Sequence, residues 1–157
     1  MTTNTHTGPT VHKIAVYDVK LVKARKPLTL REESAPDSSH AARVLHDLIG
    51  MADREQFAVL FLGPHHEIQG VQVAAIGGQS TCNVDVRTVL RGAILASASA
   101  VILAHNHPSG DPTPSQQDCD TTVALANACR VVGVPLLDHI IVTRDPDKYR
   151  AGWGAVS

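Results

Sequence analysis

The amino-acid sequence predicts a mixed α/β fold in which helices pack against a sheet, in the order helix, strand, strand, helix, strand, helix, strand (α-β-β-α-β-α-β). Short apolar runs rich in β-branched residues are the first observation, because such runs are typical of buried strands. Between these runs lie segments whose apolar residues recur at helical spacing. At 157 residues, the chain is also long enough to bury one core without disulfides.

The first helix and a pair of strands are expected early in the chain. Ser38 or Ser39 can cap the helix, because a serine hydroxyl accepts a free N–H of the first turn, and Gly50 is expected to end it. The apolar stripe of this helix consists of Val44, Leu45, Leu48 and Ile49. The run "FAVLFL" at 57–62 predicts a buried strand, and "EIQGVQVAAI" at 67–76 predicts a second strand that returns beside it.

The second half of the chain repeats this alternation. Apolar residues at helical spacing predict a helix over 84–99, and "AVILAH" predicts a strand over 100–105. The run "VPLLDHIIVT" predicts a last strand over 134–143, and turns are expected after it, with Trp153 as a packing anchor near the C-terminus.

A further helix is expected between these two strands, ending near residue 131. Thr113 is the expected N-cap, Pro114 suits the first helical position, and Gln116 stands where a capping-box partner would. One face of the helix is expected to pack on the sheet; it carries Ser115, Asp118, Thr122, Leu125, Cys129 and Val132.

The sequence also predicts where the domain begins. Residues 1–37 are expected to form an N-terminal tail and an extended arm, because 1–12 lack periodicity and 13–23 mix apolar and β-branched residues. Residues 38–157 are expected to form a single domain.

The bulk charge argues against a protein that binds nucleic acid by charge alone. The formal net charge is −1, and aromatic residues make up 3% of the chain, which leaves few side chains for stacking on bases. Binding to nucleic acid is therefore expected to be weak or indirect at most.

Cysteine usage and hydropathy predict a cytoplasmic protein. Cys82, Cys119 and Cys129 form no CxxC pair, and we expect them to be reduced thiols. The polar N-terminus has no signal-peptide pattern, and no apolar run approaches the roughly 20 residues that cross a bilayer, so no membrane partner is expected.

The segment "AHNHPSGDPTPSQQD" at 104–118 carries the chemistry. His105 and His107 alternate at the end of a predicted strand, so their side chains point the same way. Asp118 lies on the first turn of the next helix, on the face turned toward the histidines. Two imidazoles and one carboxylate form a typical catalytic zinc set, with a fourth position open to water. We therefore expect one Zn²⁺ per chain.

This segment resembles the motif of the RadC-like branch of the JAB/MPN (JAMM) metalloprotease superfamily. The resemblance rests on His105, His107, Pro108, Ser115 and Asp118, on the "LLDHIIV" run, and on a glutamate just ahead of the first core strand, in "REQFAVLFL". It covers roughly residues 38–150 and implies a JAB/MPN-like (cytidine deaminase-like) mixed sheet flanked by helices.

The resemblance also implies a role for each residue. His105, His107 and Asp118 would hold Zn²⁺, Glu55 would be the general acid/base for the zinc water, and Ser115 would hydrogen-bond the oxyanion of a tetrahedral intermediate. The implied activity is hydrolysis of a peptide or isopeptide bond by zinc-activated water. The peptide or protein substrate and the oligomeric state are left open.

Two departures from the wider superfamily bear on this expectation. Asn106 stands between the histidines, where deubiquitinating relatives carry Ser or Thr and RadC-like proteins carry Asn. Longer RadC proteins have an N-terminal helix-hairpin-helix region, whereas only about 37 residues precede the domain here, so the chain resembles a short form without that region.

Three alternatives are weighed against the hydrolase. One is a DNA-repair-associated accessory protein with a structural or vestigial zinc site, and another is a non-catalytic MPN scaffold. The third, an HNH nuclease, fits poorly because those enzymes spread their His, Asn and His over a ββα unit.

Asp138 and His139 must point to opposite sides of their strand, so one of them can orient a ligand imidazole, with plain packing as the alternative. Substrate specificity is expected in the loops 77–83 and 108–113.

Overall fold

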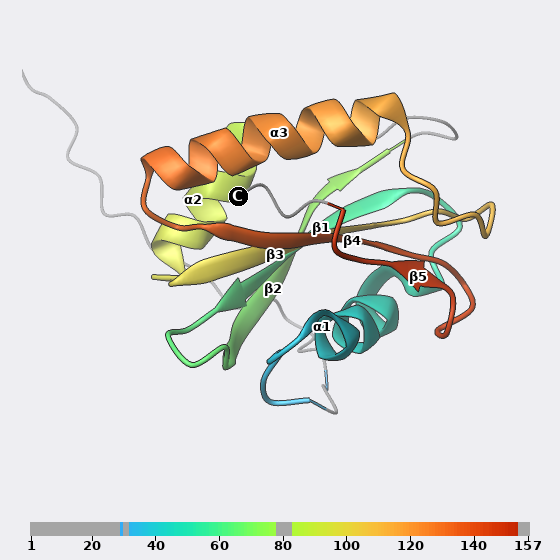
Figure 1. Ribbon diagram of the computed structural model, residues 1–157, viewed down its shortest axis with the longest axis horizontal. Helices are drawn as coiled ribbons and strands as arrows, with labels where there is room; N and C mark the ends of the chain where they lie inside the picture. The colour runs from blue at the N-terminus through green and yellow to red at the C-terminus, as the bar shows by residue number, and fades with distance from the viewer. Residues whose placement is uncertain (1–28, 30–31, 78–82, 154–157) are drawn as a thin grey trace, which may run out of the picture.

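The computed structural model describes residues 29, 32–77 and 83–153, which form a sheet between two helical layers (Figure 1). The sheet has the strand order β2-β1-β3-β4-β5, with β3 and β4 parallel and the other pairs antiparallel. Its strands are β1 (Gln56–Leu62), β2 (Ile68–Ile76), β3 (Ala100–Asn106), β4 (Leu136–Val142) and β5 (Tyr149–Arg150). The predicted mixed α/β fold is confirmed, and it is consistent with a JAB/MPN-like architecture.

The helices divide between the two faces of the sheet. Helix α1 (Ser38–Leu45) and the π-helical turn η1 (His46–Gly50) cover one face. Helices α2 (Val86–Leu95) and α3 (Gln116–Val131) cover the other (Figure 1). In the part of the chain that the structure describes, no helix is both long and apolar enough to cross a bilayer.

The alternation of side chains along each strand builds a core on each face. Ala58, Leu60 and Leu62 of β1 pack toward α1, whereas Phe57, Val59 and Phe61 pack toward α2 and α3. The same alternation in β3 sends His105 to the α3 side and its neighbour Asn106 to the α1 side.

The ends of α1 and α2 differ in detail from the prediction. Asp37, rather than Ser38 or Ser39, caps α1, because its carboxylate accepts hydrogen bonds from the backbone N–H groups of Ser39 and His40. Gly50 ends the helical segment as expected, but through the π-helical turn η1. Helix α2 (Val86–Leu95) is shorter than the predicted 84–99 at both ends. Asp85 is its N-cap, and Ala96 is its C-cap, followed by Ser97 with a positive φ of 52° that ends the helix.

The start of α3 corrects a second expectation. The N-cap is Ser115 and not Thr113, because both the N–H and the hydroxyl of Thr113 donate to the Asp111 carboxylate in the preceding loop. Pro114 therefore precedes the helix, and Asp118, not Gln116, is the capping-box partner of Ser115.

Two further outcomes concern the ends of the chain. The segment after β4, expected to hold only turns, includes the short strand β5, which pairs with the end of β4. The predicted extended run at 13–23 and Cys82 lie outside the described residues.

The predicted inner face of α3 is largely confirmed. Thr122, Leu125 and Cys129 are buried, whereas Val132, just after the helix, is exposed.

Candidate metal centre

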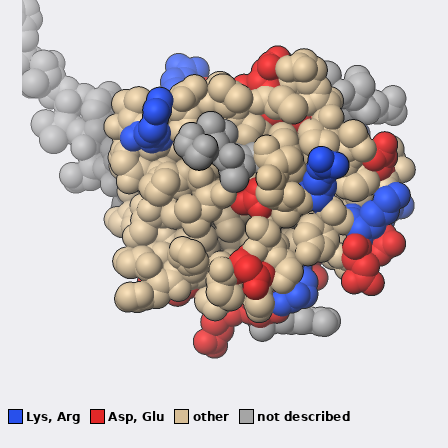
Figure 2. Space-filling model, viewed as in Figure 1, with Lys and Arg blue, Asp and Glu red and all other residues tan. Residues whose placement is uncertain are grey.

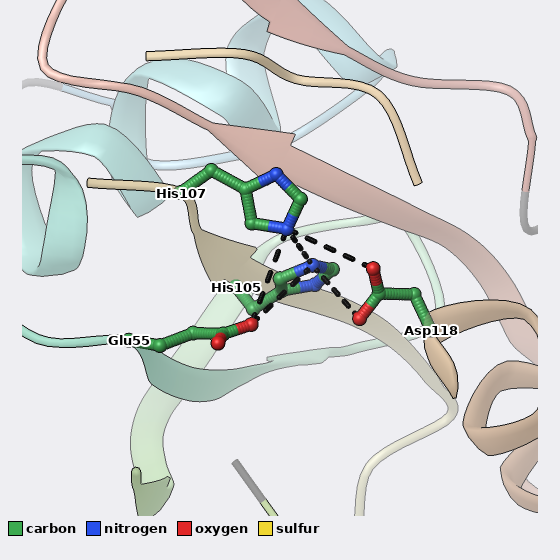
Figure 3. A group of neighbouring side chains, drawn as sticks. All are labelled: Glu55, His105, His107 and Asp118. Atoms are coloured by element: carbon green, nitrogen blue, oxygen red, sulfur yellow. Dashed lines mark hydrogen bonds and ion pairs between the residues drawn. The ribbon is translucent and has the colours of Figure 1, made fainter. Parts of the chain in front are cut away.

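Three elements bring four potential ligands together at one end of the sheet. His105 is the second-last residue of β3, and His107 directly follows that strand. Asp118 lies in the first turn of α3. Glu55 directly precedes β1. The pairing of β1 with β3 begins with Phe57 opposite His105, which brings Glu55 to the same end of the sheet as the histidines. One ligand atom from each of the four residues lies within 4.8 Å of the others, and Glu55 and Asp118 approach the imidazoles from opposite sides (Figure 3).

The spacing of the ligand atoms separates three residues from the fourth. The Nε2 atoms of His105 and His107 are 3.0 Å apart, and the Asp118 carboxylate lies 3.2 Å from one and 3.7 Å from the other. Zinc bonds of roughly 2.0–2.1 Å place tetrahedral ligand atoms about 3.3 Å apart. Glu55 lies farther out, at 3.9 and 4.0 Å from the two Nε2 atoms.

Both imidazoles present Nε2 to the centre because Nδ1 is bonded elsewhere. His107 Nδ1 lies 2.7 Å from the backbone carbonyl of Asp111, which can only accept, so this nitrogen carries the proton. His105 Nδ1 lies 2.8 Å from His139 Nε2, on the side away from the centre. Two Nε2 atoms at 3.0 Å need a proton or a cation between them, and the flanking carboxylates favour either.

Ser115 holds the Asp118 carboxylate. The backbone N–H and the hydroxyl of Ser115 both donate to Asp118 Oδ2, at 2.7 and 2.6 Å, and the Asp118 N–H donates back to the hydroxyl. Oδ1 is left facing His105 Nε2 at 3.2 Å. The capping box of α3 thus orients one of the candidate ligands.

The electrostatics of the centre follow from this close packing. Burial raises the pKa of Asp118, but hydrogen bonds from His105 and His107 lower it by more, so the carboxyl is ionised far below its usual range. The same carboxylate raises the pKa of His107 above its usual value. His105 is buried, whereas the side chains of Glu55, His107 and Asp118 are 15–20% exposed, so the centre is open on one side.

Asn106 fixes the backbone on either side of Glu55. Its Oδ1 accepts a hydrogen bond from the Gln56 N–H at 2.7 Å, and its Nδ2 donates to the Arg54 carbonyl at 3.0 Å. The carbonyl of Glu55 itself accepts from Gly77 N–H. Sequence reasoning expected Asn106 only to turn aside, and no local signal in the sequence shows which segment it would hold.

Asp138 and His139 point to opposite sides of β4, as expected. The register between β3 and β4 shifts by one residue just before Asp138. His139 consequently faces α3 and contacts His105, and Asp138 faces α1, where it accepts from the Ser38 hydroxyl and the Gly152 N–H. Of the two expected specificity loops, 108–113 supplies the Asp111 carbonyl, and most of 77–83 lies outside the described residues.

Comparison with known proteins gives matches over the part of the chain that forms the sheet and the candidate metal centre. A family model described as the RadC-like JAB domain matches residues 35–150. The chain belongs to this family. A UPF0758 protein of Carboxydothermus hydrogenoformans is 45% identical over 94 residues, or 60% of this chain and 42% of that protein. A UPF0758 protein of Symbiobacterium thermophilum is 47% identical over 88 residues, or 56% of this chain and 38% of that protein.

These relatives are longer than the segment they share with this chain. A third UPF0758 protein, from Moorella thermoacetica, is 40% identical over 101 residues, which cover 44% of its length. The chain thus spans less than half the length of the curated relatives it matches, and their names give no activity. The family and the cluster of Glu55, His105, His107 and Asp118 together fit a JAMM-type domain with a possible metal site.

Proposed function

We propose that this RadC-like JAB domain is a zinc-dependent hydrolase of JAMM type that cleaves a peptide or isopeptide bond. The observation that carries the proposal is the spacing in the centre. Two Nε2 atoms and one carboxylate lie near the edge length of a zinc tetrahedron, and Glu55 lies one step farther out. Two nitrogen ligands with one carboxylate, open to solvent on one side, suit Zn²⁺ better than all-oxygen metals such as Mg²⁺.

Zinc held by three protein ligands lowers the pKa of a bound water to about 7, which supplies a nucleophile at neutral pH. In this proposal His105, His107 and Asp118 hold the ion. The Glu55 carboxylate takes the proton from the attacking water and returns it to the leaving amine. Asn106 keeps Glu55 in place by fixing the backbone of its two neighbours.

Ser115 has two tasks in this proposal. Its backbone N–H holds Asp118 throughout. Its hydroxyl, which donates to Asp118 Oδ2, must rotate away to donate to the oxyanion of the substrate carbonyl. Because the N–H bond is independent of the side-chain torsion, Asp118 stays oriented while the hydroxyl turns.

The alternatives have less support among the described residues. A non-catalytic scaffold does not need the full set of ligands that this chain carries. Figure 2 shows acidic and basic side chains scattered over one face, with no basic patch among the residues described there. Weak or indirect binding of nucleic acid therefore stays part of the proposal. We also propose a reducing compartment such as the cytoplasm, because Cys119 and Cys129 are free thiols.

Two substitutions test the proposal by separating catalysis from metal binding. Glu55→Gln keeps the shape but removes the proton acceptor, so zinc content and melting temperature should hold while hydrolysis drops by about 10²-fold or more. Asp118→Asn is a weaker ligand and should lose zinc as well as activity. Activity is measured with a quenched-fluorescence peptide library and its lysine-isopeptide counterpart, and zinc by elemental analysis.

Full activity in Glu55→Gln would remove Glu55 from the mechanism. Joint loss of zinc and activity in that variant would make it a ligand or a structural residue. If the zinc-loaded protein cleaves neither kind of linkage, the hydrolase proposal is contradicted.

A further inference from the structure

A buried chain of hydrogen bonds runs from α3 through β4 to the candidate ligand His105. The Thr122 hydroxyl lies 2.6 Å from the carbonyl of Asp118 and 2.6 Å from His139 Nδ1. His139 Nε2 in turn lies 2.8 Å from His105 Nδ1. Thr122, His139 and His105 are 2%, 0% and 1% exposed, so these hydrogen bonds are shielded from bulk water.

The direction of each hydrogen bond follows from its first acceptor. A backbone carbonyl can only accept, so the Thr122 hydroxyl donates its one proton to Asp118. The hydroxyl oxygen then accepts from His139, which requires the proton on Nδ1 of that ring. The His139 ring is fully buried against the aromatic rings of Phe57 and Trp153, where a charged imidazole would lose its hydration, so the ring is neutral and its Nε2 has a lone pair.

The last bond of the chain decides the state of His105. Because His139 Nε2 can only accept, His105 must donate from Nδ1. Its own Nε2 is then without a proton, and this is the atom that faces His107, Asp118 and Glu55. A metal needs this lone pair, since an imidazole binds through a deprotonated nitrogen.

We propose that Thr122 and His139 are positioning residues that fix the tautomer of His105, so that Nε2 is always free to bind the metal. The inference rests on the proposed metal site but goes beyond it, since neither residue contributes a ligand atom: of the candidate ligands, Thr122 bonds only the backbone carbonyl of Asp118, and His139 bonds Nδ1 of His105. Loss of the Thr122 hydroxyl would leave His139 Nδ1–H without an acceptor. His139 could then carry its proton on Nε2 and donate to His105, which would move the His105 proton to Nε2 and block the metal.

The described residues around this chain of hydrogen bonds offer no substitute for the Thr122 hydroxyl as an acceptor for His139. The ring of Phe57 stacks on His105, with an interplanar angle of 4°, and meets His139 edge-on. Trp153 covers another side of His139, with ring centroids 4.6 Å apart. These rings offer no hydrogen-bond acceptor, and the Thr122 hydroxyl is the side-chain partner that His139 Nδ1 has among the described residues.

The test uses the whole chain with Thr122→Val, which keeps the β-branched shape and removes the hydroxyl. Thr122→Ser restores the hydroxyl, and Thr121→Val is a matched control at the neighbouring position of α3. Zinc dissociation constants are measured by competition with a chromophoric chelator, and ring nitrogen shifts by ¹⁵N–¹H NMR of the metal-free protein. Far-UV circular dichroism checks that each variant is folded.

In the wild-type protein, NMR should show Nδ1–H on both His105 and His139. Thr122→Val should shift His105 toward Nε2–H and weaken zinc binding by about 10–100-fold, the usual cost of losing such an outer partner. Thr122→Ser and Thr121→Val should stay within about threefold of wild type.

Two results would overturn the inference. One is Nε2–H on His105 in the wild-type protein, which needs no variant to fold. The other is a folded Thr122→Val protein with wild-type zinc affinity and an unchanged His105 tautomer. If the wild-type protein binds no zinc, the proposed function fails, whereas the NMR result still decides between the two tautomers.

Discussion

His139 is a buried imidazole, and its environment links the stability of the protein to pH. Burial holds its pKa well below the ordinary value of 6.5. In the unfolded chain the same ring takes up a proton near pH 6.5. Below that pH the unfolded state therefore binds the extra proton first, and the free energy of unfolding falls until the folded pKa is reached.

The expected result is a loss of stability between pH 7.5 and 5.5 that depends on His139. One proton is worth up to about 1.4 kcal/mol per pH unit. The raised pKa of His107 acts in the opposite direction, and the lowered pKa of Asp118 affects stability only below about pH 5, but both groups are also present in His139→Gln. Urea unfolding of the metal-free proteins should show a shallower pH slope in His139→Gln, and equal slopes would contradict this account.

At the scale of elements, Asn106 joins the end of β3 to the segment that leads into β1. Its amide accepts from the Gln56 N–H on one side of Glu55, and on the other side it donates to the carbonyls of Arg54 and, at 3.4 Å, Ala52. Asn106 is fully buried, so its removal leaves polar backbone groups without partners.

Asn106→Ala should lower the free energy of unfolding by roughly 1–3 kcal/mol, the cost of buried groups left without a partner. Hydrolysis should fall with it, because Glu55 loses its fixed backbone, while zinc affinity stays within about threefold. Asn127→Ala, on the exposed side of α3, is the control and should change neither quantity. Chemical denaturation measures the first effect, and a variant as stable and active as wild type would show that this tether is dispensable.

The parts of the site that depend on local periodicity were predictable from the sequence. Strand alternation places His105 and His107 on one side, and helical spacing turns Asp118 toward them. Glu55 was found only through the family resemblance, because a glutamate ahead of a strand has no local mark of a site. The helix caps were mistaken where adjacent polar residues compete: Asp111 accepts from Thr113, and the cap passes to Ser115.

The hydrogen-bond chain lay beyond sequence reasoning for a different reason. One side of β4 was expected to reach the site, and the structure shows that His139 does so. The side that it occupies depends on the register shift against β3, which brings an extra residue into β4. The partner Thr122 depends in addition on how α3 lies across the sheet, and single-sequence patterns do not specify that packing.

At the scale of the whole molecule, the sheet brings together site residues from segments that are far apart in the sequence. β1 supplies the segment with Glu55, β3 supplies the histidines, and β4 supplies His139, while α3 closes the centre with Asp118. Because β1 and β3 are neighbours in the sheet, Glu55 and the two histidines are held at the ends of buried strands, and Asp118 is held by the capped first turn of α3. A metal is therefore expected to bind a site that is already formed, with little rearrangement of the fold.

We expect this site to hold zinc through three residues, with Glu55 outside the ligand shell. An anomalous-scattering map at the zinc edge, from crystals of the zinc-loaded protein, tests it most directly. We expect one peak per chain, at roughly 2.0–2.2 Å from Nε2 of His105, Nε2 of His107 and the Asp118 carboxylate. Glu55 should reach a zinc-bound water by a hydrogen bond of roughly 2.6–3.2 Å. No peak at this site, or a peak bonded directly to Glu55, would contradict it.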